Sequence, residues 1–174
     1  TALGNFVVVD RTAASFPTAA ASWNAAPYDN TTGPLAKAVY FAHSPTAVVG
    51  ALRHALATGG NKTRFQARAG RHSYTAAAAT TDNCVVIDVG NITGVSDVVR
   101  KPDGTFVAEV GIGERLFSVY DRLAAQGFMF PGGSCPTVGI AGFVLGGGVG
   151  VWGRQYGLGA DNLVGAEVAT ITAA

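Results

Sequence analysis

The sequence predicts a mixed domain of short strands and two helices, of the α+β or α/β class. Two observations carry this prediction: short apolar runs typical of buried strands, and two segments whose apolar residues recur at helical spacing. With 174 residues the chain is long enough to bury a core of its own. We expect an N-terminal strand and loop region over residues 1–34 and a main domain over residues 35–174.

Each element follows from a local pattern. Strands are expected at residues 6–9, 39–42, 65–68, 84–89, 105–110 and 166–171, and residues 12–34 are expected mostly as loop. The first helix follows Ser44 as its N-cap, has Pro45 at its first position and ends at Gly59. The second helix opens at Gly113 and stops at Gly127.

The composition is apolar for an isolated domain, with 48% hydrophobic and 13% charged residues. No stretch reaches the roughly 18 uninterrupted apolar residues of a membrane-spanning helix. We therefore expect an apolar face that is covered by something outside these 174 residues. The net charge of +1 gives no electrostatic reason to expect nucleic acid or an anionic membrane surface as a partner.

Two glycine-bearing turns carry the strongest chemical signal. His72 lies in Arg68-Ala-Gly-Arg-His-Ser-Tyr74, and Cys135 lies in Pro131-Gly-Gly-Ser-Cys-Pro-Thr-Val-Gly139. Glycine lets the backbone approach a flat ligand closely, and each turn adds a nucleophilic side chain. One imidazole and one thiol on two such loops are suited to tether a single planar cofactor at two points.

These motifs, with Val86-Ile-Asp88 between them and Gly146-Gly-Gly-Val-Gly150 after them, resemble the FAD-binding (PCMH-type) domain of the vanillyl-alcohol-oxidase and berberine-bridge-enzyme family. The likeness runs from about residue 40 to 170 and points to the branch with bicovalently attached flavin, the glucooligosaccharide and hexose oxidases. The resemblance implies an α+β fold of two small α/β subdomains with FAD between them. The substrate domain of that family is absent from this chain.

The resemblance also assigns residues. His72 would bond to the flavin 8α-methyl carbon and Cys135 to ring carbon C6. The other cofactor-binding positions implied are Arg68, Gly70, Arg71, Ser73 and Tyr74 in and before the first turn, and Gly133, Val138, Gly139, Gly142, Gly148, Gly150, Asp161, Asn162 and Val168 along a second wall. The small Val138 matches a position that controls oxygen access and favours an oxidase.

One departure from the family pattern concerns the first turn. The family usually has Gly-Gly-His, and Arg71 replaces the second glycine here. An arginine could reach a phosphate, or it could crowd the turn if φ must be positive there. Ala141 likewise replaces a frequent glycine.

By the same resemblance, the chain would be the FAD-binding portion of an oxidase that acts on carbohydrates or related alcohols, with oxygen as the electron acceptor. The catalytic base is expected outside this chain, in a continuation or a second polypeptide. Three glycosylation sequons, at Asn30, Asn61 and Asn91, together with a start at Thr1 rather than Met, suggest secretion.

Several alternatives remain open at this level. Gly148-Val-Gly-Val-Trp-Gly153 is a literal dinucleotide-binding motif, although the residues after it form a poor helix. Cys135 could be inert or form a disulfide with Cys84, and His72 could be an ordinary surface histidine. A non-catalytic FAD or nucleotide module and a reductase with non-covalent FAD are the competing functions. A metal site and a serine hydrolase lack the required spacing.

Overall fold

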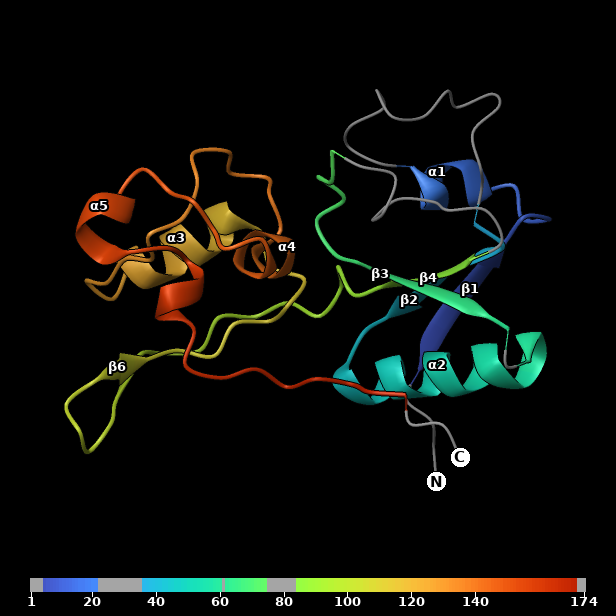
Figure 1. The fold of residues 1–174 in the computed structure, drawn as a ribbon, viewed down its shortest axis with the longest axis horizontal. Coiled ribbons are helices and arrows are strands. Elements are labelled where there is room, and N and C mark those ends of the chain that lie inside the picture. The colour runs from blue at the N-terminus through green and yellow to red at the C-terminus, as the bar shows by residue number, and fades with distance from the viewer. Residues whose placement is uncertain (1–4, 22–35, 61, 75–83, 172–174) are drawn as a thin grey trace.

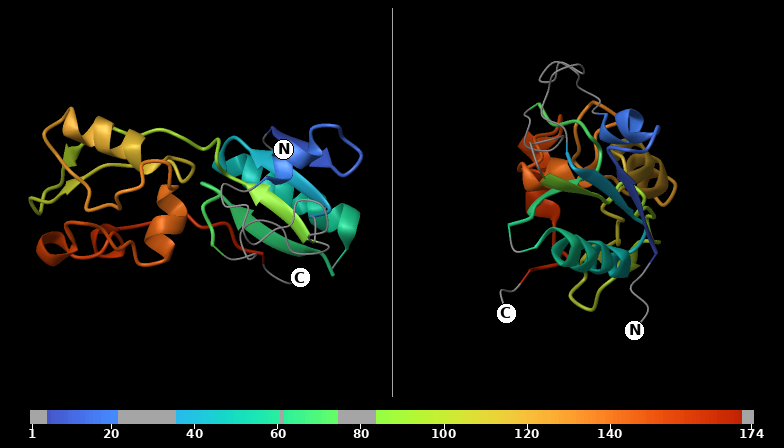
Figure 2. Two further views of the ribbon diagram at one scale, coloured as in Figure 1. Left: turned by 90° about the horizontal axis from the view of Figure 1, so that it is seen from above. Right: turned by 90° about the vertical axis from the view of Figure 1, so that its right-hand side faces the viewer.

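The computed structural model describes residues 5–21, 36–60, 62–74 and 84–171, and these form two lobes that lie side by side (Figures 1 and 2). The first lobe, residues 5–90, contains β1 (Phe6–Asp10), α1 (Phe16–Ala20), β2 (Ala38–Ala42), α2 (Pro45–Gly59), β3 (Arg64–Arg68) and β4 (Cys84–Asp88). The second lobe, residues 91–171, contains β5 (Val99–Arg100), β6 (Phe106–Val107), α3 (Leu116–Ala124), α4 (Ile140–Leu145), α5 (Gly153–Tyr156) and a 3₁₀ helix, η2 (Ala160–Asn162). The predicted two-part α+β architecture is confirmed.

The first lobe is built on a four-stranded sheet of order β1-β2-β4-β3. β2 and β3 both run parallel to β4, and β1 closes one edge antiparallel to β2. The parallel strands β2 and β3 require a crossover, which α2 supplies. As predicted, Ser44 caps α2, because its hydroxyl oxygen accepts a hydrogen bond from the backbone N of Ala47 at 3.1 Å.

Helices cover both faces of this sheet, so its central strand β4 is buried along its whole length (Figure 1). The residues packed between the sheet and α1 include Phe16, Ala19, Val39, Cys84 and Val86. The residues packed between the sheet and α2 include Tyr40, Ala51, Ala55, Val85 and Ile87. A strand buried on both faces is continuously apolar, which is why the run from Cys84 was readable in the sequence.

The second lobe has little regular structure. β5 and β6 form a two-stranded hairpin, and α3 buries Leu116, Val119 and Leu123 on one face. α4 and α5 have only six and four residues. The segment that follows η2, residues 163–171, is extended and exposed throughout.

Four sequence predictions were wrong in detail. α1 lies within residues expected as loop, because five residues are too few to show a helical period. α3 begins at Leu116 rather than Gly113, since the backbone at Gly113 packs against the carbonyls of Val89 and Gly90. The strand expected over 105–110 is only Phe106–Val107 plus an isolated pairing of Val110 with Val95. Residues 166–171 form no strand.

The structure also locates features tied to the protein's surroundings. Among the described residues, no helix combines the length and apolar composition that crossing a membrane would need. Of the three sequons, Asn91 is exposed in the loop after β4, whereas Asn30 and Asn61 lie outside the described residues. The expected boundary near residue 34 also lies outside them, although β1 pairs with β2 across it.

Candidate functional site

Two loops from different lobes meet at the candidate site. The first loop, residues 69–74, follows β3, and the second loop, residues 131–139, connects the α3 region to α4. Gly70 and Gly139 are in direct backbone contact: a Cβ added to Gly139 would lie 2.7 Å from the backbone N of Gly70, and one added to Gly70 would overlap the backbone of Gly139. Side chains do not tolerate such distances, so the close approach of the two loops requires glycine at both positions.

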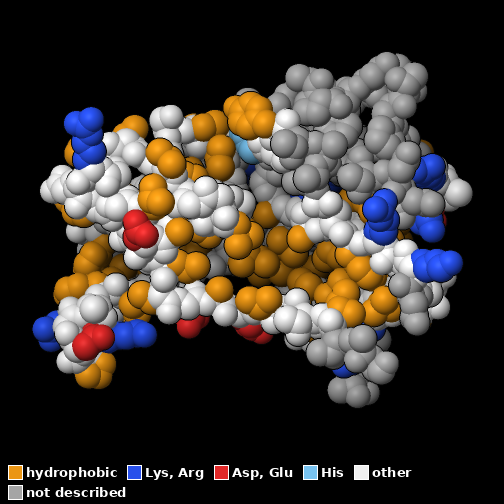
Figure 3. All heavy atoms as spheres, viewed as in Figure 1, with side chains coloured by type: hydrophobic (Ala, Val, Ile, Leu, Met, Phe, Trp, Pro, Cys, Tyr) orange, Lys and Arg blue, Asp and Glu red, His pale blue; other side chains and the backbone are white. Residues whose placement is uncertain are grey.

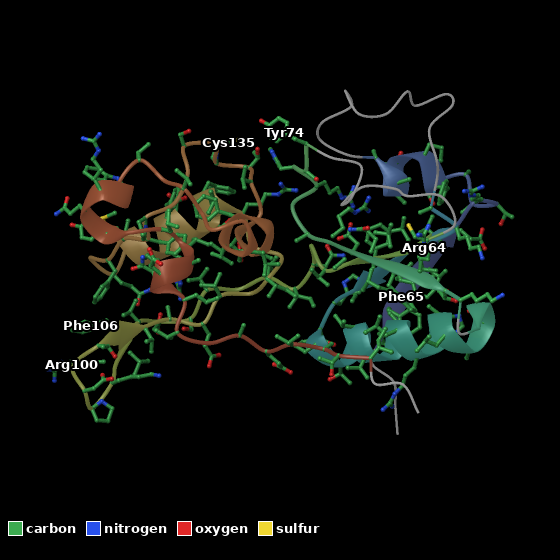
Figure 4. All side chains as sticks on the ribbon, viewed as in Figure 1. Arg64, Phe65, Tyr74, Arg100, Phe106 and Cys135 are labelled. Carbon is green, nitrogen blue, oxygen red and sulfur yellow. The ribbon has the colours of Figure 1, made fainter. Side chains whose placement is uncertain are left out.

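The two nucleophilic side chains meet at one hydroxyl group. The Nε2 atom of His72 lies 3.0 Å from the Oγ1 atom of Thr137, and the Sγ atom of Cys135 lies 3.6 Å from the same Oγ1. Figure 4 shows Cys135 and Tyr74 on the facing sides of the two lobes. Residues 63 positions apart in the sequence are thus brought to one place, with an exposed threonine between them.

The surroundings shift the pKa of both nucleophiles downward. Partial burial lowers the pKa of His72, and the positive charge of Arg115 acts in the same direction. The hydroxyl of Thr137, followed by the backbone N–H groups of Thr137 and Val138, lowers the pKa of Cys135 by hydrogen bonding to its sulfur. Both shifts favour a neutral imidazole and a thiolate, which are the nucleophilic forms of these side chains.

A buried ion network supports the first loop. The Nε atom of Arg68 donates to Oδ2 of Asp88 at 2.8 Å, and its terminal nitrogens donate to the backbone carbonyls of Ala19 and Ala20. The side chain of Arg68 is 0% exposed. Arg68 was expected to bind cofactor; its guanidinium is enclosed and bonded to these partners, so its side chain holds the first loop in place. Oδ1 of Asp88 accepts from the backbone N of Gly90 at 2.9 Å.

Arg71 adopts the left-handed backbone conformation that its replacement of glycine had put in question. Its φ is +63°, and it is the one non-glycine residue with positive φ among the described part of the chain. Its guanidinium donates to Oδ2 of Asp88 at 3.0 Å and lies 5.9 Å from the centre of the Phe41 ring. These contacts offset the cost of the conformation and direct the side chain toward the sheet.

Arg115 ties the first loop to the second. Its Nη1 atom donates to the carbonyl of Gly70 at 3.3 Å and also to the carbonyl of Thr137. Arg115 precedes α3, whose first backbone N–H groups, those of Leu116 and Phe117, donate to the carbonyls of Val138 and Pro136. The second loop therefore satisfies the N-terminus of α3, which would otherwise leave unpaired donors.

The residues expected to form the second wall of the cofactor site differ in their surroundings. Gly142 is exposed and has nothing within 4 Å of an added Cβ, which leaves room beside its backbone. Gly148 and Gly150 pack instead against Gly159 and against the carbonyls of Pro131 and Gly132. Three of the remaining positions make hydrogen bonds within the second lobe. The carbonyl of Gly133 accepts from the Tyr120 hydroxyl at 2.6 Å, the carboxylate of Asp161 accepts from the backbone N of Leu158, and the side-chain amide of Asn162 donates to the carbonyls of Tyr156 and Leu158. Val168 is 73% exposed.

Two residues of the site escaped the sequence analysis. Thr137 was part of the quoted motif but was given no role, and Arg115 was not singled out. Both act through contacts to residues 22 to 65 positions away, which no local pattern reveals. Ser73 and Tyr74 lie in the first loop as expected, half-buried and exposed respectively.

The structure argues against two of the alternatives, the dinucleotide-binding motif and the disulfide. The motif Gly148 to Gly153 follows helix α4 instead of a strand and opens a helix of only four residues, so it cannot present the long helix of a dinucleotide fold. Cys84 and Cys135 are both free, and Cys84 lies in the core. The described residues contain no cluster of three metal-ligating side chains.

The arrangement fits a flavin. Hydrophobic side chains gather in the hollow between the two lobes (Figure 3). The two nucleophiles, His72 and Cys135, lie on the two loops that contact each other. A planar apolar ring system with two points of attachment matches this combination of apolar surface, glycine backbone and paired nucleophiles. The residues that would hold FAD are His72, Cys135, the backbone of the first loop and that of the second loop.

Comparison with known protein families matches residues 36–173 to the family described as FAD binding domain. The chain is 38% identical over 101 residues to the FAD-linked oxidoreductase pytB of Aspergillus terreus, covering 58% of this chain and 12% of that protein. It is 31% identical over 105 residues to berberine bridge enzyme-like 21 of Arabidopsis thaliana (60% and 19%). It is 36% identical over 100 residues to reticuline oxidase of Eschscholzia californica (57% and 18%). The chain thus spans less than a fifth of the length of each of these relatives.

Solved structures agree with this grouping. BBE-like 1 of Physcomitrella patens superposes with a TM-score of 0.73 at 29% identity, covering 91% of this chain and 32% of that one. The fold is also that of 6-hydroxy-D-nicotine oxidase from Arthrobacter nicotinovorans, with a TM-score of 0.75 at 24% identity over 92% and 33% of the two chains. Because the family match spans most of the sequence, the chain belongs to the FAD-binding domain family of the VAO/PCMH flavoproteins and has homologues among the berberine-bridge-enzyme-like proteins.

Proposed function

We propose that this chain is the FAD-binding portion of a secreted flavoprotein oxidase and that its FAD is attached covalently through His72 and Cys135. The observation that carries the proposal is the meeting of both side chains at the Thr137 hydroxyl, at 3.0 and 3.6 Å. Two bonds to one ring system require two nucleophiles within the width of that ring. Their lowered pKa values favour the forms that can make such bonds.

The proposed reaction oxidises a carbohydrate or a related alcohol. His72, Cys135 and the backbone of the two loops would hold FAD, which would supply the two-electron chemistry that takes a hydride from the CH–OH carbon and reduces O₂ to hydrogen peroxide, leaving a carbonyl product. The protein would hold the cofactor from both lobes and orient it, and the small Val138, which is half-buried, would leave oxygen access to the ring. A relative named as an oxidase, reticuline oxidase at 36% identity, supports oxidase chemistry in general.

The rest of the enzyme would cover the second lobe. Large hydrophobic side chains are exposed along residues 145–171, among them Leu145 at 86%, Val149 at 77% and Val164 at 76%. Isolated soluble proteins rarely leave so many large apolar side chains exposed to water along one segment. We place the substrate domain and the catalytic base in the protein that packs there, as a continuation or a second chain. The exposed Asn91 sequon supports secretion.

Denaturation of purified, flavin-loaded protein tests the covalent attachment. We expect yellow absorbance to remain with the precipitated chain, to persist partly in His72→Ala or Cys135→Ala, and to disappear in the double variant. His43→Ala is a matched control, because His43 is exposed at the end of β2 and should retain full colour.

Two other results would replace the proposal. Flavin that leaves with the supernatant, together with consumption of reduced nicotinamide, would identify a reductase with non-covalent FAD. Retained flavin with no peroxide formed from any sugar or alcohol by the full-length protein would identify a binding module.

A further inference from the structure

The hydroxyl of Thr137 stands between the two proposed anchors and bonds to both. Its Oγ1 atom lies 3.0 Å from Nε2 of His72 and 3.6 Å from Sγ of Cys135. A hydroxyl has one proton to donate and two lone pairs to accept with, so it cannot donate to both partners. The direction of these two hydrogen bonds therefore fixes the protonation of the imidazole and the sulfur together.

The surroundings of the sulfur decide that direction. The Thr137 hydroxyl is the group in hydrogen-bond contact with the sulfur, and it is the main cause of the lowered pKa of Cys135, followed by the backbone N–H groups of Thr137 and Val138. The pKa of Cys135 is lowered, so the sulfur favours the thiolate, and a thiolate can only accept a hydrogen bond from the Thr137 hydroxyl 3.6 Å away. The Thr137 proton therefore points toward the sulfur, and the Thr137 oxygen is left as an acceptor for the imidazole.

The surroundings of the imidazole agree with this direction. Partial burial disfavours an imidazolium at His72, and so does the charge of the Arg115 guanidinium, which is held by the carbonyls of Gly70 and Thr137. A neutral imidazole carries one N–H and one lone pair. Since the Thr137 oxygen needs a donor at Nε2, the N–H lies on Nε2 and the lone pair on Nδ1.

We propose that Thr137 is a positioning residue that couples the two anchors, accepting the Nε2–H of His72 and donating its own proton to the Cys135 sulfur. The consequence is an imidazole with Nδ1 as its nucleophilic nitrogen and a sulfur held as thiolate, before any flavin is attached. This proposal rests on the proposed function only in taking His72 and Cys135 as the flavin anchors. It concerns protonation states and includes no bond-forming step.

Two variants of the flavin-free chain test the coupling. Thr137→Val keeps the shape of the side chain and removes the hydroxyl, and Thr137→Ser is the matched control that keeps it. Alkylation by iodoacetamide at pH 7 is followed by peptide mass, so that Cys135 is separated from the buried Cys84. We expect the Cys135 rate to fall about three- to tenfold in Thr137→Val and to stay near the parent value in Thr137→Ser.

Long-range ¹H–¹⁵N NMR of His72 gives the second readout. Above its pKa, the parent chain should show the proton on Nε2, and Thr137→Val should lose this preference while Thr137→Ser keeps it. A parent tautomer with the proton on Nδ1 would overturn the proposal, as would an unchanged alkylation rate in a Thr137→Val chain with the parent's melting temperature. If the melting temperature of Thr137→Val is lower than that of the parent chain, the alkylation rate is set aside and the His72 tautomer of the parent chain alone tests the proposal.

These measurements are independent of flavin attachment. Suppose that flavin stays on the denatured parent chain, while Thr137→Val has the parent's Cys135 alkylation rate and His72 tautomer. That result would refute the coupling and leave the proposed function standing. If Thr137→Val changes both the Cys135 alkylation rate and the His72 tautomer, but the parent chain never retains flavin, the proposed function is refuted and the coupling stands.

Discussion

The two lobes differ in how completely they bury their apolar side chains. Both clusters of buried core residues lie in the first lobe, where α1 and α2 close the two faces of the sheet. Among the described residues, fifteen of the nineteen exposed large hydrophobic side chains lie at or after Val99, in the second lobe. The second lobe also has a hollow of about 240 Å³ whose lining includes four aromatic residues, Tyr120, Phe128, Phe130 and Trp152.

This difference separates two roles at the site. The first lobe holds His72 from a sheet that is complete in itself, and the buried pair of Arg68 and Asp88 anchors its loop. The second lobe holds Cys135 from a loop between short helices, fastened mainly by Arg115 and the N-terminus of α3. We therefore expect the first lobe to be rigid on its own and the second to gain order from the protein that covers it.

Hydrogen exchange should show the largest contrast between the lobes. The backbone amides of β4 are buried on both faces and should exchange only on global unfolding, whereas those of residues 163–171 should exchange almost freely. The expected difference in protection is about 10³-fold or more for a domain of ordinary stability. Mass spectrometry of the exchanging chain measures it, and equal protection in the two segments would contradict the comparison.

Removal of the buried carboxylate should give the largest change in stability. Asp88→Ala leaves the guanidinium of Arg68 charged and enclosed, and should lower the free energy of unfolding by about 3–5 kcal/mol. Asp97→Ala is the matched control in the second lobe, where Asp97 pairs with Arg122 at the surface. Its side chain is 81% exposed, so the loss there should stay below about 1 kcal/mol. Urea denaturation at pH 7 compares them, and similar losses would mean that the first loop is not anchored as described.

A smaller effect is expected at Arg71, which has a φ of +63°. Arg71→Ala and Arg71→Gly both lose the hydrogen bond to Asp88, but only glycine adopts this conformation without cost. The glycine variant should therefore be more stable than the alanine variant by about 1 kcal/mol. Thermal unfolding of the two variants measures the difference. If alanine were the more stable replacement, the left-handed turn would not exist in solution.

The smallest effect concerns pH. The pKa of His72 is lowered on folding from a reference of 6.5, so the unfolded chain takes up this proton first as the pH falls. The stability contributed by neutral His72 is therefore present above pH 6.5 and is lost as the pH falls through the lower folded pKa. Melting temperatures of the flavin-free parent and His72→Gln at pH 7.5 and 5.5 test this. The parent should lose slightly more stability than the variant, and the opposite sign would mean that the pKa is raised.

Local patterns in the sequence were sufficient to predict most of the first lobe, although not the five-residue helix α1. Ser44 and Pro45 define the start of α2, and the apolar run from Cys84 defines the central strand, because these signals lie within a few residues. The second lobe was predicted less well. The strand expected at 166–171 has the right residues, but a strand needs a partner, and none of the described residues pairs with it.

The same distinction applies to the site. Glycines and nucleophiles can be recognised in a short motif, and the replacement of a family glycine by Arg71 pointed to the position where φ is positive. The enclosure of Arg68, the bridging hydroxyl of Thr137 and the bonds of Arg115 arise from contacts between loops far apart in the sequence. Such contacts depend on the folded arrangement and have no local signature.

Peptide mapping of native, flavin-loaded protein tests the central claim most directly. Digestion under denaturing conditions should release one species in which the peptide containing His72 and the peptide containing Cys135 are joined through a single flavin. Recovery of both peptides at their unmodified masses, from protein that carried FAD before denaturation, would contradict the account.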